Sequence, residues 1–267
     1  MYETRHAGVK GFGAFATRPI PRGTRIISER PLLAVDSERH VFAATRALSE
    51  RDRSALLRLS ISPIRRSSVL SWTETAWHVT RHAVLDIFRT RRDDGAKTRL
   101  PSLIRTIGQY PTILNVFRNN NFDLGRGNGQ AVFHDTSRLN HACVPNAQGN
   151  FDTRLGRFTV HAVRAIAVGE EITLSYLAEH GALRASRRGR LLESHGFLCD
   201  CPACVDGGEG EERRLAVQAR LHAFAEREQM DVRAELEMME GLIGLFRAEG
   251  LAAVSYTHLT LPTKRIV

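Results

Sequence analysis

Three cysteines lie within six positions of the stretch "HGFLCDCPACVDG": Cys199, Cys201 and Cys204. Thiolate sulfur is a preferred ligand of zinc, and a structural zinc ion takes four protein ligands in a tetrahedral arrangement. A short loop with this spacing can supply three corners of such a site. The chain has one further cysteine, Cys143, and if it is the fourth ligand, a single all-cysteine zinc site uses every thiol in the sequence.

Disulfide bonds and unligated thiols are the alternatives for these cysteines. Four cysteines allow two disulfide bonds. However, the N-terminal stretch "MYETRHAGVKGFG" lacks the apolar segment of a secretory signal peptide, so we expect a cytoplasmic or nuclear protein with reduced thiols. Cys199 and Cys201 are also too close for an easy mutual bridge. Reduced cysteines without a metal remain the second interpretation.

A second group of polar residues lies in "RLNHACVPN", where Asn140 and His141 come shortly before Cys143. An asparagine amide both donates and accepts, and a histidine ring offers one donor and one acceptor, so the pair can bind a polar ligand. His141 and Cys143 could also form a thiol nucleophile with its base, although no oxyanion element or orienting partner is evident. As a further alternative, His141 is a histidine bonded within the core.

The stretch "VGEEITLSY" contains Glu170, Glu171 and Tyr176. Neighbouring side chains on a strand point to opposite faces, so the two glutamates are predicted to be structural residues at the start of a strand rather than a paired acid and base. Near the N-terminus, the glycines of "KGFG" allow a turn in which the backbone approaches a ligand. A plain hairpin turn is the alternative there.

The elements that must position these residues are short strands interrupted by helices. Residues 8–35 and 131–177 are rich in strand formers punctuated by turn residues. Residues 38–118 carry apolar side chains at helical spacing instead. Residues 182–195 are predicted to form a basic helix that leads to the cysteine loop, and residues 211–249 are predicted to be helical.

Composition limits the class of protein. The chain has 267 residues, of which 42% are hydrophobic, so it can bury a substantial core, and no stretch is apolar enough to span a bilayer. The net charge of +9 permits attraction to nucleic acid. However, the arginines are scattered through predicted helices such as "RASRRGR" and are interpreted as solvated faces. We therefore expect neither a membrane nor directly bound nucleic acid as a partner.

Four motifs in this order, "GVKGFGAFATRPIPRGTRI", "RLNHACVPNA", "VGEEITLSY" and the cysteine cluster, resemble the SET-domain family of protein lysine methyltransferases. The match spans residues 5–205 and is interrupted by a helical insertion. The insertion and the cysteines look most like the SET-and-MYND branch and its fungal relatives. The MYND module itself is absent, because four cysteines cannot furnish its two zinc sites.

The resemblance implies a mostly β fold of small sheets with α-helical additions. It also implies a pseudoknot, formed where the chain passes under the "NHACVPN" loop. The last stretch, "VSYTHLTLPTKRIV", looks like a translated sequencing adapter appended to a truncated chain. The expected divisions are 5–37 and 119–180 for the two parts of the SET domain, 38–118 for the insertion, 181–206 for the post-SET zinc region, 207–253 for a helical C-terminal segment and 254–267 for the artefact.

The resemblance further implies S-adenosylmethionine and zinc as cofactors. In the family, the residue after the Asn-His pair is usually serine, and here it is the smaller Ala142. The matching cysteine of the SET-and-MYND branch, here Cys143, joins the other three on zinc, which would fasten the C-terminal loop over the cofactor site. The residues implied to bind the cofactor are Lys10, Gly11, Phe12, Gly13, Asn140, His141, Tyr176 and Phe197.

Tyr176 stands where the family has its catalytic tyrosine. Phe122, in "NNNFDLG", is implied to line the lysine channel together with Tyr176. Ordinary core packing is the alternative for Phe122 and for Phe197. The expected function is methylation of a lysine in a histone or another protein, in the nucleus or the cytoplasm. The alternative function is that of a non-catalytic SET-fold module that binds protein or chromatin.

Overall fold

The computed structural model describes residues 1–61, 77, 80, 112–125, 127–178, 181–205, 208–225 and 232–251. Most of the predicted insertion and all of the predicted artefact lie outside these residues. The strands are β1 (Tyr2–His6), β2 (Phe12–Ala16), β3 (Arg25–Glu29), β4 (Leu33–Val35), β5 (Asn121–Asp123), β6 (Gln130–Val132), β7 (Asn140–His141), β8 (Ala147–Asp152), β9 (Arg157–Ala162) and β10 (Glu171–Leu174). The helices are α1 (Val41–Ala47), α2 (Glu50–Leu57), α5 (Arg184–His195), α6 (Pro202–Val205), α7 (Gly208–Ala225) and α8 (Val232–Ala248), with short 3₁₀ turns at Gly8–Lys10, Glu38–His40 and Thr136–Arg138.

One four-stranded sheet, in the order β1-β2-β10-β7, forms the floor of the site. β10 is antiparallel to β2 and parallel to β7, with Thr173 opposite Asn140. Just beyond β7, the backbone N–H of Ala142 donates to the carbonyl of Leu174 at 3.0 Å. Because β7 and β10 run in the same direction, the segments that follow them leave the sheet together. Two of the polar motifs of the sequence therefore lie side by side.

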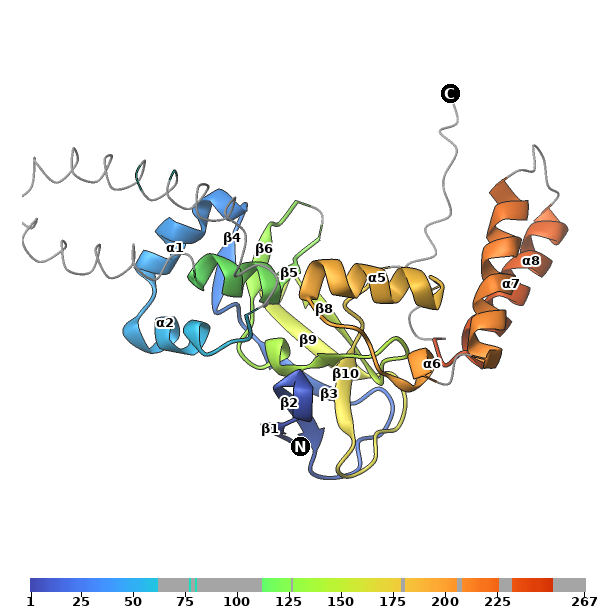
Figure 1. Cartoon of the computed structure of the whole chain (residues 1–267), viewed down its shortest axis with the longest axis horizontal. Coiled ribbons are helices and arrows are strands. Elements are labelled where there is room, and N and C mark those ends of the chain that lie inside the picture. Colours follow the sequence, from blue (N-terminus) through green and yellow to red (C-terminus); the bar gives the residue numbers. More distant parts are fainter. Residues whose placement is uncertain are drawn as a thin grey trace, which may run out of the picture.

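The main core lies between this sheet and two three-stranded sheets, β3-β9-β8 and β4-β6-β5 (Figure 1). Ala14 and Ile172 enter it from the first sheet, Val160 from the second and Ala131 from the third, and none of the four has exposed surface. Burial of side chains the size of Val160 and Ile172 stabilises the fold by about 2 kcal/mol each. These small sheets confirm the predicted fold class.

A second core joins the described helices of the N-terminal half to β4 and β6 (Figure 1). Phe42 of α1, Leu56 of α2 and Phe117, in a helical segment at 112–120, are almost completely buried there. α2 begins after Ser49, whose hydroxyl accepts a bond from the N–H of Asp52 and caps the helix. The helical prediction therefore holds for the described parts of 38–118.

The C-terminal helices follow the sequence predictions closely. α5 occupies most of the predicted basic helix. The predicted helical region 211–249 is largely covered by α7, which begins earlier, at Gly208, and by α8, and the two helices pack against each other (Figure 1). Val217, Leu242 and Phe246 form their shared apolar contact. Among the described helices, none combines the length and the apolar character needed to cross a bilayer.

Candidate active site and metal centre

A cavity of about 410 Å³ lies between the β1–β2 turn, β7 and the segment that follows α5. This volume is within the usual range for small-ligand sites. Phe12 and Gly13 are not among the residues that line it, although both were predicted to bind the cofactor. Six of the predicted cofactor residues do line it: Lys10, Gly11, Asn140, His141, Tyr176 and Phe197.

The imidazole of His141 is buried and has a contact at each nitrogen. Its Nδ1 accepts from the backbone N–H of Tyr176 at 3.0 Å, and its Nε2 lies 3.3 Å from the sulfur of Cys143. Burial lowers the pKa of His141 to about 4, so the ring is neutral. Since Nδ1 is the acceptor, Nε2 carries the proton and faces the sulfur as a donor. A ring in this state is no base for Cys143, which argues against the thiol-nucleophile alternative.

The side chain of Tyr176 forms part of the cavity wall. Its hydroxyl donates to the backbone carbonyl of Leu139 at 2.8 Å, so the ring has a fixed direction. The ring centroid lies 4.8 Å from that of His195 and 5.4 Å from that of His141. Burial, and secondarily the charge of Glu171, raises the pKa of Tyr176, and the group therefore stays protonated at neutral pH.

Tyr176 also lines a second cavity, of about 210 Å³, which is called the channel below. Phe122, the residue predicted for a lysine channel, lines this cavity, and so does Phe158 of β9. The centroids of the two rings are 5.0 Å apart and both rings contact Phe133, so Phe122 both lines this cavity and packs against the core. Tyr176 and Phe122 therefore share the walls of the channel, and Tyr176 also lines the larger cavity.

All four cysteines gather in one buried cluster. Their sulfur atoms lie within 4.8 Å of one another, and the sulfur of Cys143 is 3.9 Å from that of Cys199 and 3.5 Å from that of Cys204. Four thiolates around zinc, with Zn–S bonds of about 2.3 Å, form a tetrahedron with edges of about 3.8 Å. The cysteines are not bonded to one another. The donor set and its spacing fit a zinc ion, as the sequence predicted.

The local backbone explains how a short loop supplies three of these ligands. α5 ends at Gly196, whose left-handed φ of 81° lets its N–H bond to two carbonyls of the last turn. The chain then enters the cysteine loop, where the N–H of Cys204 donates to the carbonyl of Cys201 at 2.7 Å. From the opposite segment, the N–H of Cys143 donates to the sulfur of Cys201 at 3.4 Å. Such N–H···S bonds stabilise thiolates.

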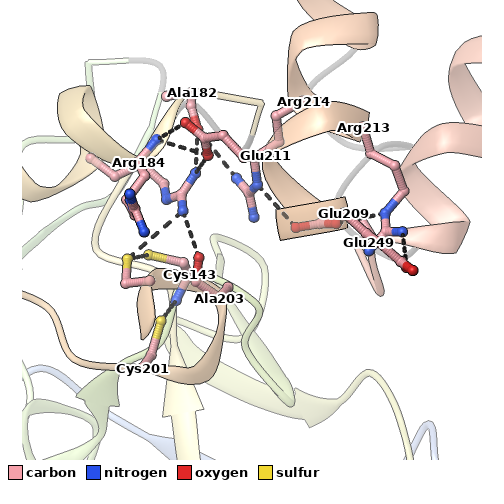
Figure 2. A network of polar contacts seen from close by, with 12 residues as sticks. Cys143, Ala182, Arg184, Cys201, Ala203, Glu209, Glu211, Arg213, Arg214 and Glu249 are labelled. Carbon is pink, nitrogen blue, oxygen red and sulfur yellow. Dashed lines mark hydrogen bonds and ion pairs between the residues drawn. The ribbon is translucent and has the colours of Figure 1, made fainter. Parts of the chain in front are cut away.

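A network of charged side chains adjoins the cluster (Figure 2). Arg187 of α5 is only 1% exposed, and its guanidinium donates to the carbonyls of Ala182 and Ala203 at 2.6 and 3.0 Å. It also lies 3.7 Å from the sulfur of Cys204 and 3.7 Å from the carboxylate of Glu211. Burial by itself would lower the pKa of Arg187, but the neighbouring cysteine sulfurs raise it. A buried cation in this position balances negative charge on the thiolates.

The same network reaches the C-terminal helices (Figure 2). Glu211 of α7 accepts from the backbone N–H of Arg184 at 2.8 Å, at the start of α5. Glu249, just after α8, is paired with Arg213 and Arg214 at 2.9 and 3.0 Å. The α7–α8 pair is therefore joined to the cysteine cluster through charged residues.

Sequence reasoning missed several residues of the site. Asp200 lines the larger cavity and pairs with Lys10 at 3.6 Å. Its position between Cys199 and Cys201 was a local signal that it would lie close to the site. Phe158 gave no such signal, because its place in the channel depends on how β8 and β9 pair. Arg187 was grouped with solvated arginines, and for this residue that interpretation is wrong.

Comparisons with known proteins identify the family. Residues 11–177 match the SET domain family, which is more than half of the chain. The chain is 30% identical over 207 residues to the histone-lysine N-methyltransferase set5 of Schizosaccharomyces pombe. The aligned region covers 77% of this chain and 50% of that protein. It is 39% identical over 79 residues to the human protein-lysine N-trimethyltransferase SMYD5, covering 29% of this chain and 19% of that protein.

A solved structure of Rubisco LSMT bound to AdoMet aligns with 81% of this chain and 58% of its own, at 13% identity and a TM-score of 0.43. The chain spans half of the fission-yeast relative and smaller shares of the other curated relatives.

Proposed function

Because this chain belongs to the SET-domain family, we propose that it transfers a methyl group from S-adenosylmethionine to the side-chain amine of a lysine in a protein substrate. The observation that carries the proposal is the position of Tyr176. This residue lines both the cavity of about 410 Å³ and the channel of about 210 Å³, so a cofactor in the first and a lysine in the second would meet at its phenol.

The residues that line the larger cavity have different roles in this proposal. S-adenosylmethionine supplies a methyl group on a positively charged sulfur, which an amine attacks in line. Asn140 would hold the polar end of the ligand, and Phe197 would pack against its adenine. His141, whose ring nitrogens both have partners inside the protein, would contribute the wall beside Asn140. Lys10 and Asp200 pair across the mouth of the cavity and bring the cysteine loop toward the β1–β2 turn. The zinc held by Cys143, Cys199, Cys201 and Cys204 would fix that loop.

The channel prepares the lysine. A free lysine is mostly protonated at neutral pH and must lose a proton before it attacks. Phe122 and Phe158 surround the entering side chain with apolar surface, which disfavours the charged ammonium form. The hydroxyl of Tyr176 is held by the carbonyl of Leu139, so it can align the amine with the methyl group. The contribution of Tyr176 is therefore orientation rather than proton removal.

The class of substrate is proposed from the relatives. The fission-yeast relative is named for histone lysine and the human one for protein lysine. We therefore take histones as the first substrates to test, with other proteins second. The nucleus and the cytoplasm are both compatible with these substrates. The net charge of +9 gives no overall attraction to a basic histone tail, so recognition must come from local contacts.

Calorimetric titration of the zinc-loaded protein with S-adenosylmethionine, and with its demethylated product, tests the cofactor half of the proposal. We expect saturable binding near one to one that is lost in Asn140→Ala. Incubation with histones and a labelled methyl donor then tests transfer. Binding without transfer to any lysine substrate would favour the non-catalytic module. A folded, zinc-containing protein that binds neither ligand would overturn the proposal.

A further inference from the structure

The amide of Asn140 is held by two acceptors at once. Its Nδ2 donates to a carboxylate oxygen of Glu171 at 2.7 Å and to the backbone carbonyl of Phe12 at 3.2 Å. A side-chain NH₂ group has two hydrogens and no lone pair to offer. Both hydrogens are therefore used inside the protein.

This pair of bonds decides which way the amide points. If the amide were reversed, its oxygen would face a carboxylate and a carbonyl, both of which repel it, and two hydrogen bonds would be lost. The observed orientation instead leaves Oδ1 as the atom that Asn140 can offer to a ligand in the larger cavity, which it lines. An amide oxygen accepts hydrogen bonds and attracts a positive group such as an ammonium.

The residues around Glu171 leave room for its contact with Asn140. A methyl group on Gly13 would lie 2.4 Å from the carboxylate of Glu171 and 2.9 Å from the amide nitrogen of Asn140, so only glycine leaves room for them to meet. The second carboxylate oxygen of Glu171 lies 3.8 Å from the ammonium of Lys10. That pairing occupies the second oxygen and leaves the first oxygen for Asn140. Gly13, the second glycine of "KGFG", is therefore needed for the contact between Glu171 and Asn140.

Glu170, the neighbour of Glu171, behaves differently. Its carboxylate accepts from Arg164, from the N–H of Ala167 and from Asn146, all away from the larger cavity. Glu170 lies just before β10 and Glu171 is its first residue, and the two carboxylates bond to different partners. Only Glu170, however, has the purely structural role predicted for both.

We propose that Glu171 is a positioning residue, which fixes the amide of Asn140 so that Oδ1 accepts from the ammonium group of the bound cofactor. This inference rests on the proposed function, because it assumes that the larger cavity takes a ligand with an amino-acid end. Glu171 itself is not proposed to contact that ligand. Replacement of Glu171 must therefore lower the affinity only for ligands that carry the ammonium group.

Two ligands separate positioning from general damage. S-adenosylhomocysteine carries the ammonium group, whereas 5′-methylthioadenosine has the same nucleoside and sulfur but lacks the amino-acid end. Both are titrated calorimetrically into the zinc-loaded wild type, Glu171→Thr, Glu171→Val and Glu171→Gln. Thr and Val suit a strand but cannot reach Asn140. Gln keeps an oxygen that can accept from it. Glu170→Gln, at the position just before the strand, is the matched control.

In the Thr and Val variants, we expect the affinity for S-adenosylhomocysteine to fall about 10- to 100-fold, the value of a hydrogen bond to a charged group. The affinity for methylthioadenosine should stay within about threefold, which also reports that the cavity is intact. Glu171→Gln should recover most of the lost affinity, and Glu170→Gln should leave the affinity for both ligands unchanged.

An equal loss of affinity for both ligands would show that Glu171 has only a structural role and would overturn the inference. Unchanged binding of S-adenosylhomocysteine in the Thr and Val variants would overturn it as well. Neither result touches the proposed function, since the wild type would still bind. A wild type that binds neither ligand would overturn the proposed function and this inference together.

Discussion

The guanidinium of Arg187 lies 3.7 Å from the sulfur of Cys204, inside the protein rather than on its surface. Four thiolates and one Zn²⁺ carry a net charge of −2, which is costly to bury without a cation nearby. Arg187 supplies that cation and is itself held by the carbonyls of Ala182 and Ala203. The cysteine cluster and this arginine therefore stabilise each other's charge.

Replacing Arg187 with methionine is expected to weaken zinc binding about 10- to 100-fold, the usual cost of losing an outer-sphere partner of a metal site. The measurement is competition for zinc with a chromogenic chelator. Arg184→Met, at an exposed position on the same helix, is the control and should leave the zinc affinity unchanged. Equal zinc affinity in the wild type and Arg187→Met would show that the thiolates need no help from this cation.

The cysteine site and the helix before it were predictable because they depend on local sequence. Cys199, Cys201 and Cys204 lie within six residues, and the chain has only one more cysteine to complete the set. Arg187 was not predictable in the same way. It belongs to a strongly basic stretch, and only the packing of α5 against the cluster distinguishes it from its solvated neighbours.

The contacts of Glu171 and Phe158 depend on strand pairing over long distances in the sequence. Glu171 meets Asn140 because β10 lies between β2 and β7. Phe158 reaches the channel because of the register between β8 and β9. Alternation along a single strand indicates which side chains share a face, but not which distant strand lies beside them. The motifs therefore predicted the main residues of the site, and the fold was needed to find their partners.

Zinc removal should expose thiols and loosen the larger cavity together. All four cysteines of the chain are in the cluster, so the number of thiols that react with a disulfide reagent should rise from none to four when zinc is chelated. Because Cys199 and Asp200 line the cavity, affinity for S-adenosylhomocysteine should fall at least about tenfold, in line with the coupling of ligation to folding.

Addition of zinc to the chelated protein is the control and should restore both properties. Retention of full ligand affinity with four reactive thiols would contradict the coupling between the metal centre and the cavity.

Tyr176→Phe removes one hydroxyl at the junction of the two cavities. We expect transfer to slow about 100-fold or more, because the amine loses its alignment, while affinity for S-adenosylhomocysteine stays within about threefold. Loss of the bond to Leu139 should lower the free energy of unfolding by about 1 kcal/mol. Single-turnover transfer, calorimetry and denaturant unfolding measure the three effects.

Tyr2→Phe is the matched control for this change. Its hydroxyl donates to Asp135 at 2.9 Å, outside both cavities, so its loss should affect stability but not transfer. A parallel fall of ligand affinity and transfer rate in Tyr176→Phe would contradict a role in alignment.

Gly149→Ala should narrow the channel proposed to take the lysine. A methyl group at this position would lie 2.3 Å from the ring of Phe158, which forms part of the channel wall beside Phe122. The ring must move, and overpacking of this kind costs about 1–3 kcal/mol of stability. Since methylated lysines are bulkier, we expect the rate of transfer to a dimethylated peptide to fall more than the rate of transfer to an unmethylated one, if the wild type accepts both.

Gly189→Ala, on α5 with open space around it, is the control and should change neither rate. Mass spectrometry of the peptides gives the number of methyl groups added. An equal effect on both peptides would mean that the displaced ring leaves the channel open and that Gly149 matters for packing alone.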